Sequence, residues 1–143
     1  MRCDLGDRAA GVLMESVMHT GRCECGAVAF EISGDLKAPS ACHCTQCRRI
    51  SGHVWSGTSV DHGNLRFTAD GGLKWYKSSD WAERGFCDTC GASLFYRPIG
   101  GDRVSVAAGA IDAPSGMKLH RHIFVADKGD YYDIADGLPQ NQH

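Results

Sequence analysis

Seven of the eight cysteines in this 143-residue chain fall into three closely spaced groups. The groups are Cys23-x-Cys25, Cys42-x-Cys44-x-x-Cys47 and Cys87-x-x-Cys90. Thiolates bind Zn²⁺ at about 2.3 Å in tetrahedral geometry, so two ligands from one segment must converge to within about 4 Å of each other. A glycine with positive φ after each pair allows such a turn, and Gly26 and Gly91 stand at those places. The spacing therefore indicates metal binding.

The first and last groups together offer four thiolates, from Cys23, Cys25, Cys87 and Cys90. Each pair lies immediately before an expected strand, at residues 27–32 and 92–96, so one ion would join two strand starts that are far apart in the sequence. Closed four-thiolate coordination leaves no room for a substrate, and we expect this zinc site to be structural. The alternatives are disulfides, a lone redox C-x-x-C pair and buried free cysteines.

The middle group supplies only three protein ligands, Cys42, Cys44 and Cys47. Three ligands and a fourth position for water or substrate are typical of a catalytic zinc. His43 could complete the shell and make the site structural. In an extended segment, however, its side chain points away from those of its two neighbours. We therefore expect His43 to be exposed or hydrogen-bonded in a turn.

Four arginines lie within a few residues of the cysteines, namely Arg22, Arg48, Arg49 and Arg84. Seven thiolates and two Zn²⁺ ions add seven negative and four positive charges, which takes the formal net charge from −2 to −5. The simplest role of each arginine is to screen this negative charge. Arg48 and Arg49 directly follow Cys47, and they could instead hold a substrate carboxylate.

The elements that must position these groups are short strands separated by turns. Apolar residues alternate with polar ones in short runs at 28–32, 55–59, 65–67, 73–75, 94–96, 104–108 and 123–125. Runs of this length and spacing predict a mainly β domain with antiparallel strands. Helix is expected only as single turns, at residues 45–50 and around 111–115.

Two further features have a less direct interpretation. Trp55, Trp75 and Trp81 could line a cleft, although we expect at least two of them in the core. Residues 138–143 show no periodicity and are expected to form an exposed end.

Composition and charge exclude several classes of protein. A net charge of −2 and a sequence pI near 6.4 give no reason to expect nucleic acid or an anionic membrane as partner. No apolar run approaches the roughly 18 residues of a membrane-spanning helix. The apolar stretch at residues 9–14 is too short for a secretory signal, so we expect a cytoplasmic protein. In that reducing compartment, closely spaced cysteines are metal ligands or redox groups rather than disulfides.

The patterned, cysteine-rich sequence begins at His19. We expect residues 1–18 to be a flexible or frayed extension, with a short helix over 9–18 as the alternative, and Cys3 has no assigned role there. Residues 19–140 are expected to form a single zinc-binding domain, since their number suits one core.

Three ordered strings closely resemble the glutathione-dependent formaldehyde-activating enzyme family, which includes the centromere protein V type. They are GRCECGAVAF at residues 21–30, CHCTQCRRISG at 42–52 and RGFCDTCGASL at 84–94. The segments HIFV at 122–125 and LPQ at 138–140 are similar to the end of the family pattern. The resemblance covers roughly residues 19–140.

The resemblance implies an Mss4-like, tent-shaped β fold of antiparallel sheets stapled by zinc. It implies two Zn²⁺ per chain, a structural ion at Cys23, Cys25, Cys87 and Cys90 and a second at Cys42, Cys44 and Cys47. It also implies a carbon–sulfur lyase activity that joins glutathione to formaldehyde as S-hydroxymethylglutathione. The partners would then be glutathione or another small thiol, and a small aldehyde.

Our hypothesis for the chemistry is that the open zinc position accepts and deprotonates the thiol. Addition of the aldehyde then needs a proton at the carbonyl oxygen, for which His43, His53 and Glu83 are candidate donors. The rival hypothesis is a non-catalytic, zinc-stapled β module that binds thiols or docks on a protein. Glutathione binding without faster adduct formation would favour the module.

Overall fold

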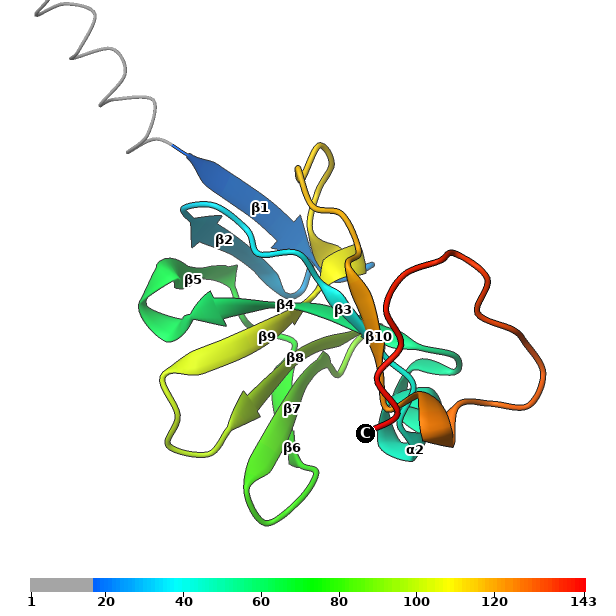
Figure 1. Ribbon diagram of the computed structural model, residues 1–143. Coiled ribbons are helices and arrows are strands. Elements are labelled where there is room, and N and C mark those ends of the chain that lie inside the picture. Colours follow the sequence, from blue (N-terminus) through cyan, green and yellow to red (C-terminus); the bar gives the residue numbers. More distant parts are fainter. Residues whose placement is uncertain (1–16) are drawn as a thin grey trace, which may run out of the picture.

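Short strands dominate the computed structural model, which describes residues 17–143. These residues form ten strands, one α-helix and three 3₁₀ helices (Figure 1). The strands are β1 (Met18–Arg22), β2 (Ala29–Ser33), β3 (Ser40–Cys42), β4 (Trp55–Asp61), β5 (Leu65–Ala69), β6 (Leu73–Lys77), β7 (Ala82–Cys87), β8 (Ser93–Pro98), β9 (Arg103–Ala107) and β10 (Arg121–Ile123). The helices are α2 (Thr45–Ser51), η1 (His62–Asn64), η2 (Ala108–Ala110) and η3 (Val125–Asp127). The predicted mainly β class is confirmed.

The strands are arranged in two sheets. β1, β2 and β5 form an antiparallel sheet with β2 in the middle. The other strands form a seven-stranded sheet in the order β10-β3-β4-β9-β8-β7-β6. Its strands pair antiparallel except at one edge, where β10 runs parallel to β3. The long connection between η2 and β10, at the top of Figure 1, allows this parallel return.

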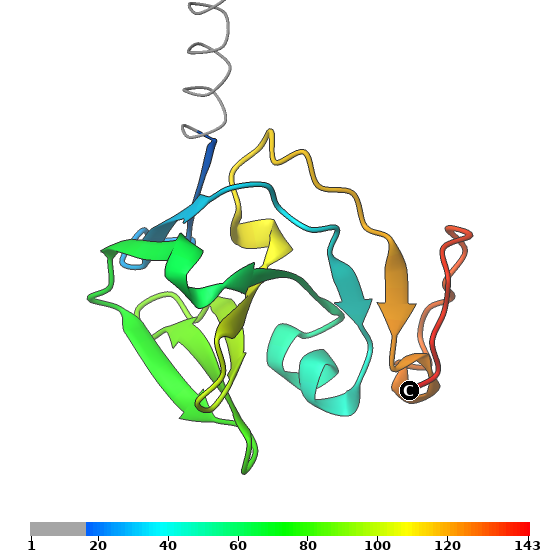
Figure 2. The same cartoon turned by 60° about the vertical axis from the view of Figure 1, so that its left-hand side comes forward.

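The main core lies between the two sheets. Phe30 and Ile32 alternate with more exposed residues on β2, as the period-two pattern predicts, and both are buried. The ring of Phe30 meets that of Phe95 on β8 edge-on, with ring centroids 5.3 Å apart. Val104 and Val106 of β9 complete the same cluster. The core therefore joins the two sheets, which are seen from two directions in Figures 1 and 2.

The helix α2 is held at both ends by local contacts. The sulfur of Cys44 accepts a hydrogen bond from the backbone N–H of Cys47 and caps the first turn. Gly52 ends the helix with φ +81° and donates its N–H to the carbonyl of Arg48. The helical turn predicted at residues 45–50 is confirmed.

The helical turn predicted around 111–115 is wrong. A 3₁₀ helix, η2, ends at Ala110, and the chain then runs along β1. Ile111 is buried and forms an isolated β-bridge with Gly21, while the N–H of Asp112 donates to the carbonyl of Thr20 at 2.8 Å. Pairing with a distant strand thus decides the conformation of this segment.

The end of the chain is exposed in its side chains, but its backbone is paired. Asn141 donates its N–H to the carbonyl of His122 at 2.8 Å, and Val125 donates to that of Asn141 at 3.0 Å. The C-terminal segment therefore runs beside β10, as the red end of the ribbon shows in Figure 1. The lack of periodicity could not predict this because backbone pairing needs no pattern of side chains.

Cys3 and nearly all of the predicted extension, residues 1–18, lie outside the described residues. Within the described part of the chain, none of the helices combines the length and apolar character needed to cross a membrane.

Candidate metal centres and an adjoining cavity

Four sulfurs come together at one end of the fold, from Cys23, Cys25, Cys87 and Cys90. They lie within 4.8 Å of one another. The sulfur of Cys25 is 3.7 Å from that of Cys23 and 3.7 Å from that of Cys87. Tetrahedral zinc with bonds of 2.3 Å requires about 3.8 Å between its sulfur ligands. The geometry of this cluster, which we call the closed cluster, therefore fits one tetrahedral ion.

Local backbone turns bring each pair of the closed cluster together. Gly26 and Gly91 have φ values of +84° and +82°, the positive angles predicted for them. Gly91 donates its N–H to the carbonyl of Cys87 at 2.8 Å, which closes the second turn. In the first turn, the N–H of Val28 donates to the sulfur of Cys23 at 3.3 Å. Such N–H donors favour the thiolate form that metal binding needs.

Three more sulfurs meet where β3 leads into α2. Cys42 ends β3, Cys44 caps the helix and Cys47 lies in its first turn, and their sulfurs are within 4.8 Å of one another. No fourth cysteine, histidine or carboxylate of the described residues joins this cluster. We call it the open cluster. A tetrahedral ion held there would keep one position free for an added ligand.

His43 lies between two residues of the open cluster but faces away from it. Its Nε2 is 2.8 Å from Nδ1 of His122, and its Nδ1 is hydrogen-bonded to the hydroxyl of Tyr132. The side chain is 2% exposed. The prediction that it points away from the sulfurs agrees with this position, but the expected exposure or turn contact is wrong. Burial and the neighbouring His122 lower the pKa of His43, so its ring is neutral at pH 7.

The thiols of the open cluster differ in their acidity. A hydrogen bond from Cys42 and the positive charge of Arg84 lower the pKa of Cys47 to about 6, although burial opposes the shift. Nη2 of Arg84 donates to the sulfur of Cys47 at 3.3 Å. The same contact with Cys47, with burial, raises the pKa of Cys42 far above its usual range. Cys47 is therefore the thiol of this pair that is ready to bind a metal ion as thiolate.

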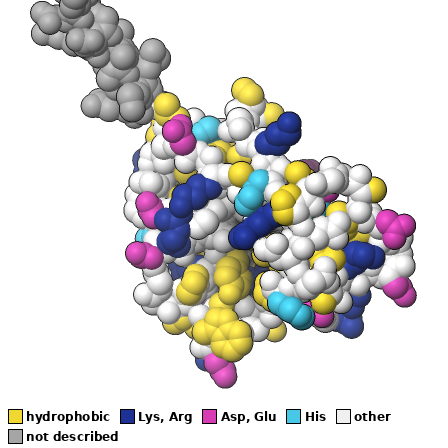
Figure 3. All heavy atoms as spheres, viewed as in Figure 1, with side chains coloured by type: hydrophobic (Ala, Val, Ile, Leu, Met, Phe, Trp, Pro, Cys, Tyr) yellow, Lys and Arg dark blue, Asp and Glu magenta, His cyan; other side chains and the backbone are white. Residues whose placement is uncertain are grey.

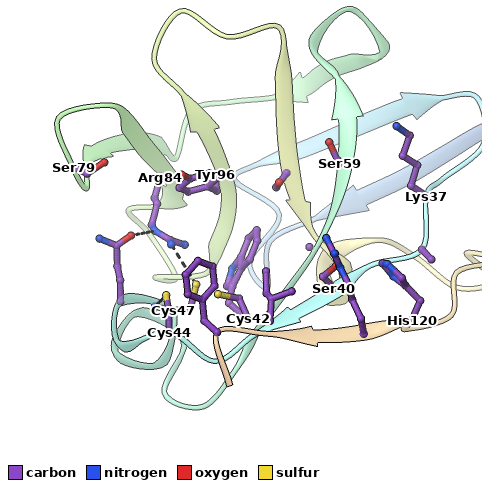
Figure 4. A pocket seen from close by; sticks show the side chains of 18 of the residues that line it. Lys37, Ser40, Cys42, Cys44, Cys47, Ser59, Ser79, Arg84, Tyr96 and His120 are labelled. Carbon is purple, nitrogen blue, oxygen red and sulfur yellow. Dashed lines mark hydrogen bonds between the residues drawn. The ribbon is translucent and has the colours of Figure 1, made fainter. Parts of the chain in front are cut away.

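A cavity of about 740 Å³ adjoins the open cluster. Its wall includes the three cysteines of that cluster together with Trp55, Tyr96 and Arg84 (Figure 4). The cavity is also lined by residues of the segment before β3 and of β10. It therefore extends along one face of the seven-stranded sheet. Trp81, which is 69% exposed, stands at its margin. On this face, hydrophobic side chains gather next to basic ones (Figure 3).

The cavity wall is basic. Lys37, Arg84, His120 and Arg121 line it, and none of its described lining residues is acidic. Figure 4 shows Lys37 and His120 on the opposite side of the cavity from Arg84 and Cys47. Nδ1 of His120 donates to the carbonyl of Pro39 at 2.9 Å, which leaves Nε2 available to a ligand. The cavity therefore combines a sulfur cluster on one side with a positive charge on the other.

Other residues singled out in the sequence lie outside this cavity. Arg48 and Arg49 are not among the lining residues, and their contact with a substrate carboxylate stays a prediction. His53 is hydrogen-bonded to the hydroxyl of Tyr131 at 2.6 Å. Glu83 forms an ion pair with Arg97.

The tryptophans divide between core and cavity. Trp55 and Trp75 pack against the core clusters, as predicted for at least two of them. Trp55 and Trp81 also line the cavity.

Of the basic residues that line the cavity, only Arg84 was singled out in the sequence. Arg84 precedes Cys87 by three residues on β7, and this closeness to a cysteine pair was its only signal. The side chain of Arg84 instead lines the cavity and contacts the open cluster, through its hydrogen bond to the sulfur of Cys47. Lys37 and Arg121 gave no signal, since the fold brings them together from distant segments.

These features define a small β protein with two cysteine clusters, one closed and one opening on a cavity. The chain belongs to the family of glutathione-dependent formaldehyde-activating enzymes, whose pattern matches residues 18–127. A lyase of Schizosaccharomyces pombe, itself uncharacterised, is 25% identical over 119 residues that span 82% of this chain and 86% of the relative. A crystal structure of a Rhodobacter sphaeroides protein has 25% identity and a TM-score of 0.55, over 66% of this chain and 88% of that one.

Family membership and the name of the Schizosaccharomyces pombe relative support a lyase-like, formaldehyde-activating function. The two clusters could hold metal ions.

Proposed function

We propose that the protein is a zinc-dependent carbon–sulfur lyase that makes and cleaves adducts between glutathione, or a similar small thiol, and formaldehyde or a related aldehyde. The observation that carries this proposal is the position of the open cluster, whose three sulfurs line a basic cavity. The family match over residues 18–127 supplies the substrate class.

Each cluster has its own part in this proposal. Zn²⁺ at the closed cluster would join the connection between β1 and β2 to the end of β7 and the turn that follows it, and its role would be structural. Zn²⁺ at Cys42, Cys44 and Cys47 would lower the pKa of a thiol in the cavity and favour its thiolate. The free thiols of the described residues suit a reducing compartment such as the cytoplasm.

The chain's own residues bind and orient the thiol. Glutathione carries a carboxylate at each end and its thiol in the middle. Lys37 and Arg121, both exposed at the cavity wall, are placed to hold a carboxylate while the thiol reaches the open cluster. Arg121 is held in place by a hydrogen bond from its Nε to the hydroxyl of Ser40 at 3.0 Å.

The reaction itself is an addition. The thiolate sulfur attacks the carbonyl carbon, a carbon–sulfur bond forms, and the electron pair of the carbonyl π bond moves to oxygen. Water supplies the proton that completes the hydroxyl group. Cleavage runs the same steps backwards, as expected of a lyase.

The substitution Cys44→Ser tests this proposal cleanly. Serine is a preferred N-cap residue, so it keeps the cap that the sulfur of Cys44 provides to α2 while removing one thiolate of the open cluster. We expect loss of one zinc per chain, loss of glutathione binding by calorimetry, and loss of adduct formation above the uncatalysed rate. Arg66→Ala, an exposed residue of β5 outside both clusters and the cavity, is the control and should retain all three.

An unchanged rate in a Cys44→Ser protein that has lost one zinc would overturn the catalytic proposal. Glutathione binding in the wild type without any acceleration would assign the protein to the rival class, a thiol-binding module.

A further inference from the structure

The unpaired polar atoms of the fold gather in one place. Among the described residues, three buried side-chain atoms lack a hydrogen-bond partner: Nε1 of Trp55, Oγ of Ser79 and Nη1 of Arg84. All three residues line the cavity beside the open cluster. Buried polar groups in proteins are almost always hydrogen-bonded, and an exception demands an explanation. Their shared location indicates that a polar ligand completes them.

Of these three residues, Arg84 has the highest cost of leaving a buried atom unpaired, because its side chain carries a charge. Its side chain is charged and only 5% exposed. No carboxylate of the described residues forms an ion pair with it, and no acidic residue among them lines the cavity. The sulfur of Cys47 contacts Nη2 and leaves Nη1 a buried, charged donor without an acceptor, so an anion or a developing negative charge in the cavity would bind there.

The guanidinium group is also held in one orientation. Nε donates to Oε1 of Gln46 at 2.9 Å, and the amide nitrogen of Gln46 donates in turn to the carbonyl of Ser78 at 3.1 Å. Nη2 donates to the sulfur of Cys47 at 3.3 Å. The ring of Tyr96 lies 4.9 Å from the guanidinium carbon. Nη1 is therefore the one nitrogen of Arg84 left for a ligand, and it is fixed beside the open cluster (Figure 4).

We propose that Arg84 is a catalytic residue, and that its Nη1 binds the oxygen of the carbonyl compound that adds to the thiol. This inference rests on the proposed function and names the second substrate's site. As the thiolate sulfur bonds to the carbonyl carbon, the π electron pair moves to oxygen, and the hydrogen bond from Nη1 strengthens with the growing negative charge. Arg84 stays protonated throughout, and water supplies the proton of the hydroxyl group.

The proposal explains why an arginine is buried beside sulfurs that must also be thiolates. One nitrogen contacts Cys47, and the next presents a donor to the oxygen that lies two bonds from the reacting sulfur in the adduct. Trp55, whose ring centroid is 5.8 Å from the guanidinium carbon, offers Nε1 as a second donor for the same cavity. If Arg84 acted on Cys47 alone, its Nη1 would remain a buried donor without a hydrogen-bond partner.

The test compares two stable analogues of glutathione. Glutathione sulfonate carries negatively charged oxygens on its sulfur, whereas S-methylglutathione carries a methyl group there. Calorimetry measures both dissociation constants for the zinc-loaded wild type, Arg84→Met and Arg84→Lys, with the zinc content of each variant determined. Wild type should bind the sulfonate at least about tenfold more tightly, and Arg84→Met should bind both analogues alike, with S-methylglutathione unchanged within about twofold.

Arg84→Lys keeps a positive charge near Cys47 but not a fixed second donor, so it should also lose most of the preference. It replaces Arg84→Met in the comparison if that variant does not fold. In the variants that fold, kcat for adduct formation should fall about a hundredfold while KM for glutathione stays constant.

Two results would overturn the inference. If both Arg84 variants kept the full preference for glutathione sulfonate, Arg84 would not be the residue that binds the substrate oxygen. The proposed function would be unaffected by that result. A wild type that binds neither glutathione nor either analogue would remove the proposed function and this inference with it.

Discussion

Nε2 of His43 and Nδ1 of His122 lie 2.8 Å apart in the protein interior, between the open cluster and the C-terminal segment. His122 continues to Asp136 through its Nε2, at 2.7 Å, and Tyr132 contacts the far nitrogen of His43. With the hydroxyl of Tyr132 donating to His43, His43 to His122 and His122 to Asp136, every ring nitrogen has a hydrogen-bond partner. These hydrogen bonds join the segment of the open cluster to residues 132–136.

His122→Phe should therefore destabilise the protein. The substitution leaves the buried Nε2 of His43 without an acceptor, at a cost of about 1–3 kcal/mol in the free energy of unfolding. Asp136→Asn is the matched control, because its exposed side chain keeps an oxygen acceptor for His122. Denaturant unfolding of the zinc-loaded proteins measures both. Equal unfolding free energies for His122→Phe and wild type would show that the hydrogen bond between His43 and His122 does not stabilise the fold.

Removal of one thiolate from the closed cluster should affect the whole fold. Cys25 is exposed, so its sulfur contributes little packing, and any large effect of Cys25→Ser must come through the metal ion. We expect a loss of several kcal/mol in unfolding free energy, in contrast to under about 1 kcal/mol for Cys44→Ser. Thermal unfolding followed by circular dichroism compares the two variants. A fully stable Cys25→Ser protein would contradict a structural ion at this cluster.

A chelator should remove the two ions at different rates. An ion at the open cluster would have three protein ligands and one position open to a chelator from the cavity, whereas an ion at the closed cluster would have four thiolate ligands. Zinc release to a coloured chelator should therefore have a fast and a slow phase, with loss of the fold following only the slow one. Cys44→Ser should lack the fast phase. A single phase for two ions would contradict the difference between the clusters.

Recognition of glutathione should depend on the basic side of the cavity. Lys37→Ala and Arg121→Ala should each weaken glutathione binding about threefold to tenfold, because each removes one exposed partner of a carboxylate. Binding of 2-mercaptoethanol, which has no carboxylate, should not change. Calorimetry with both thiols makes the comparison. Arg49→Ala is the informative counterpart, since a larger loss there than at Arg121 would favour the carboxylate contact predicted from the sequence.

The sequence predicted the features that depend on local spacing. The grouping of cysteines agrees with the groups the structure brings together, because each pair lies within one turn and needs only a glycine at Gly26 or Gly91 to close. The short strands followed from alternation of apolar residues, as at Phe30 and Ile32.

What the sequence did not predict depends on contacts between distant segments. His43 is buried because β10 and the C-terminal segment pack over it, and no local pattern links it to His122 or Tyr132. Arg84 lies three residues before Cys87 of the closed cluster on β7, but its side chain contacts Cys47 of the open cluster. This contact depends on the fold and not on the spacing along the chain. The cavity follows from the fold rather than from any motif.

The proposed chemistry requires that the open cluster hold a metal ion with one position available to a thiol. Replacement of the bound metal by ¹¹³Cd gives each site its own NMR signal, sensitive to the number of sulfur ligands. We predict two resonances, of which only one shifts when glutathione is added, and we predict that Cys44→Ser removes that resonance and leaves the other. A single resonance, or two that glutathione leaves in place, would contradict the account.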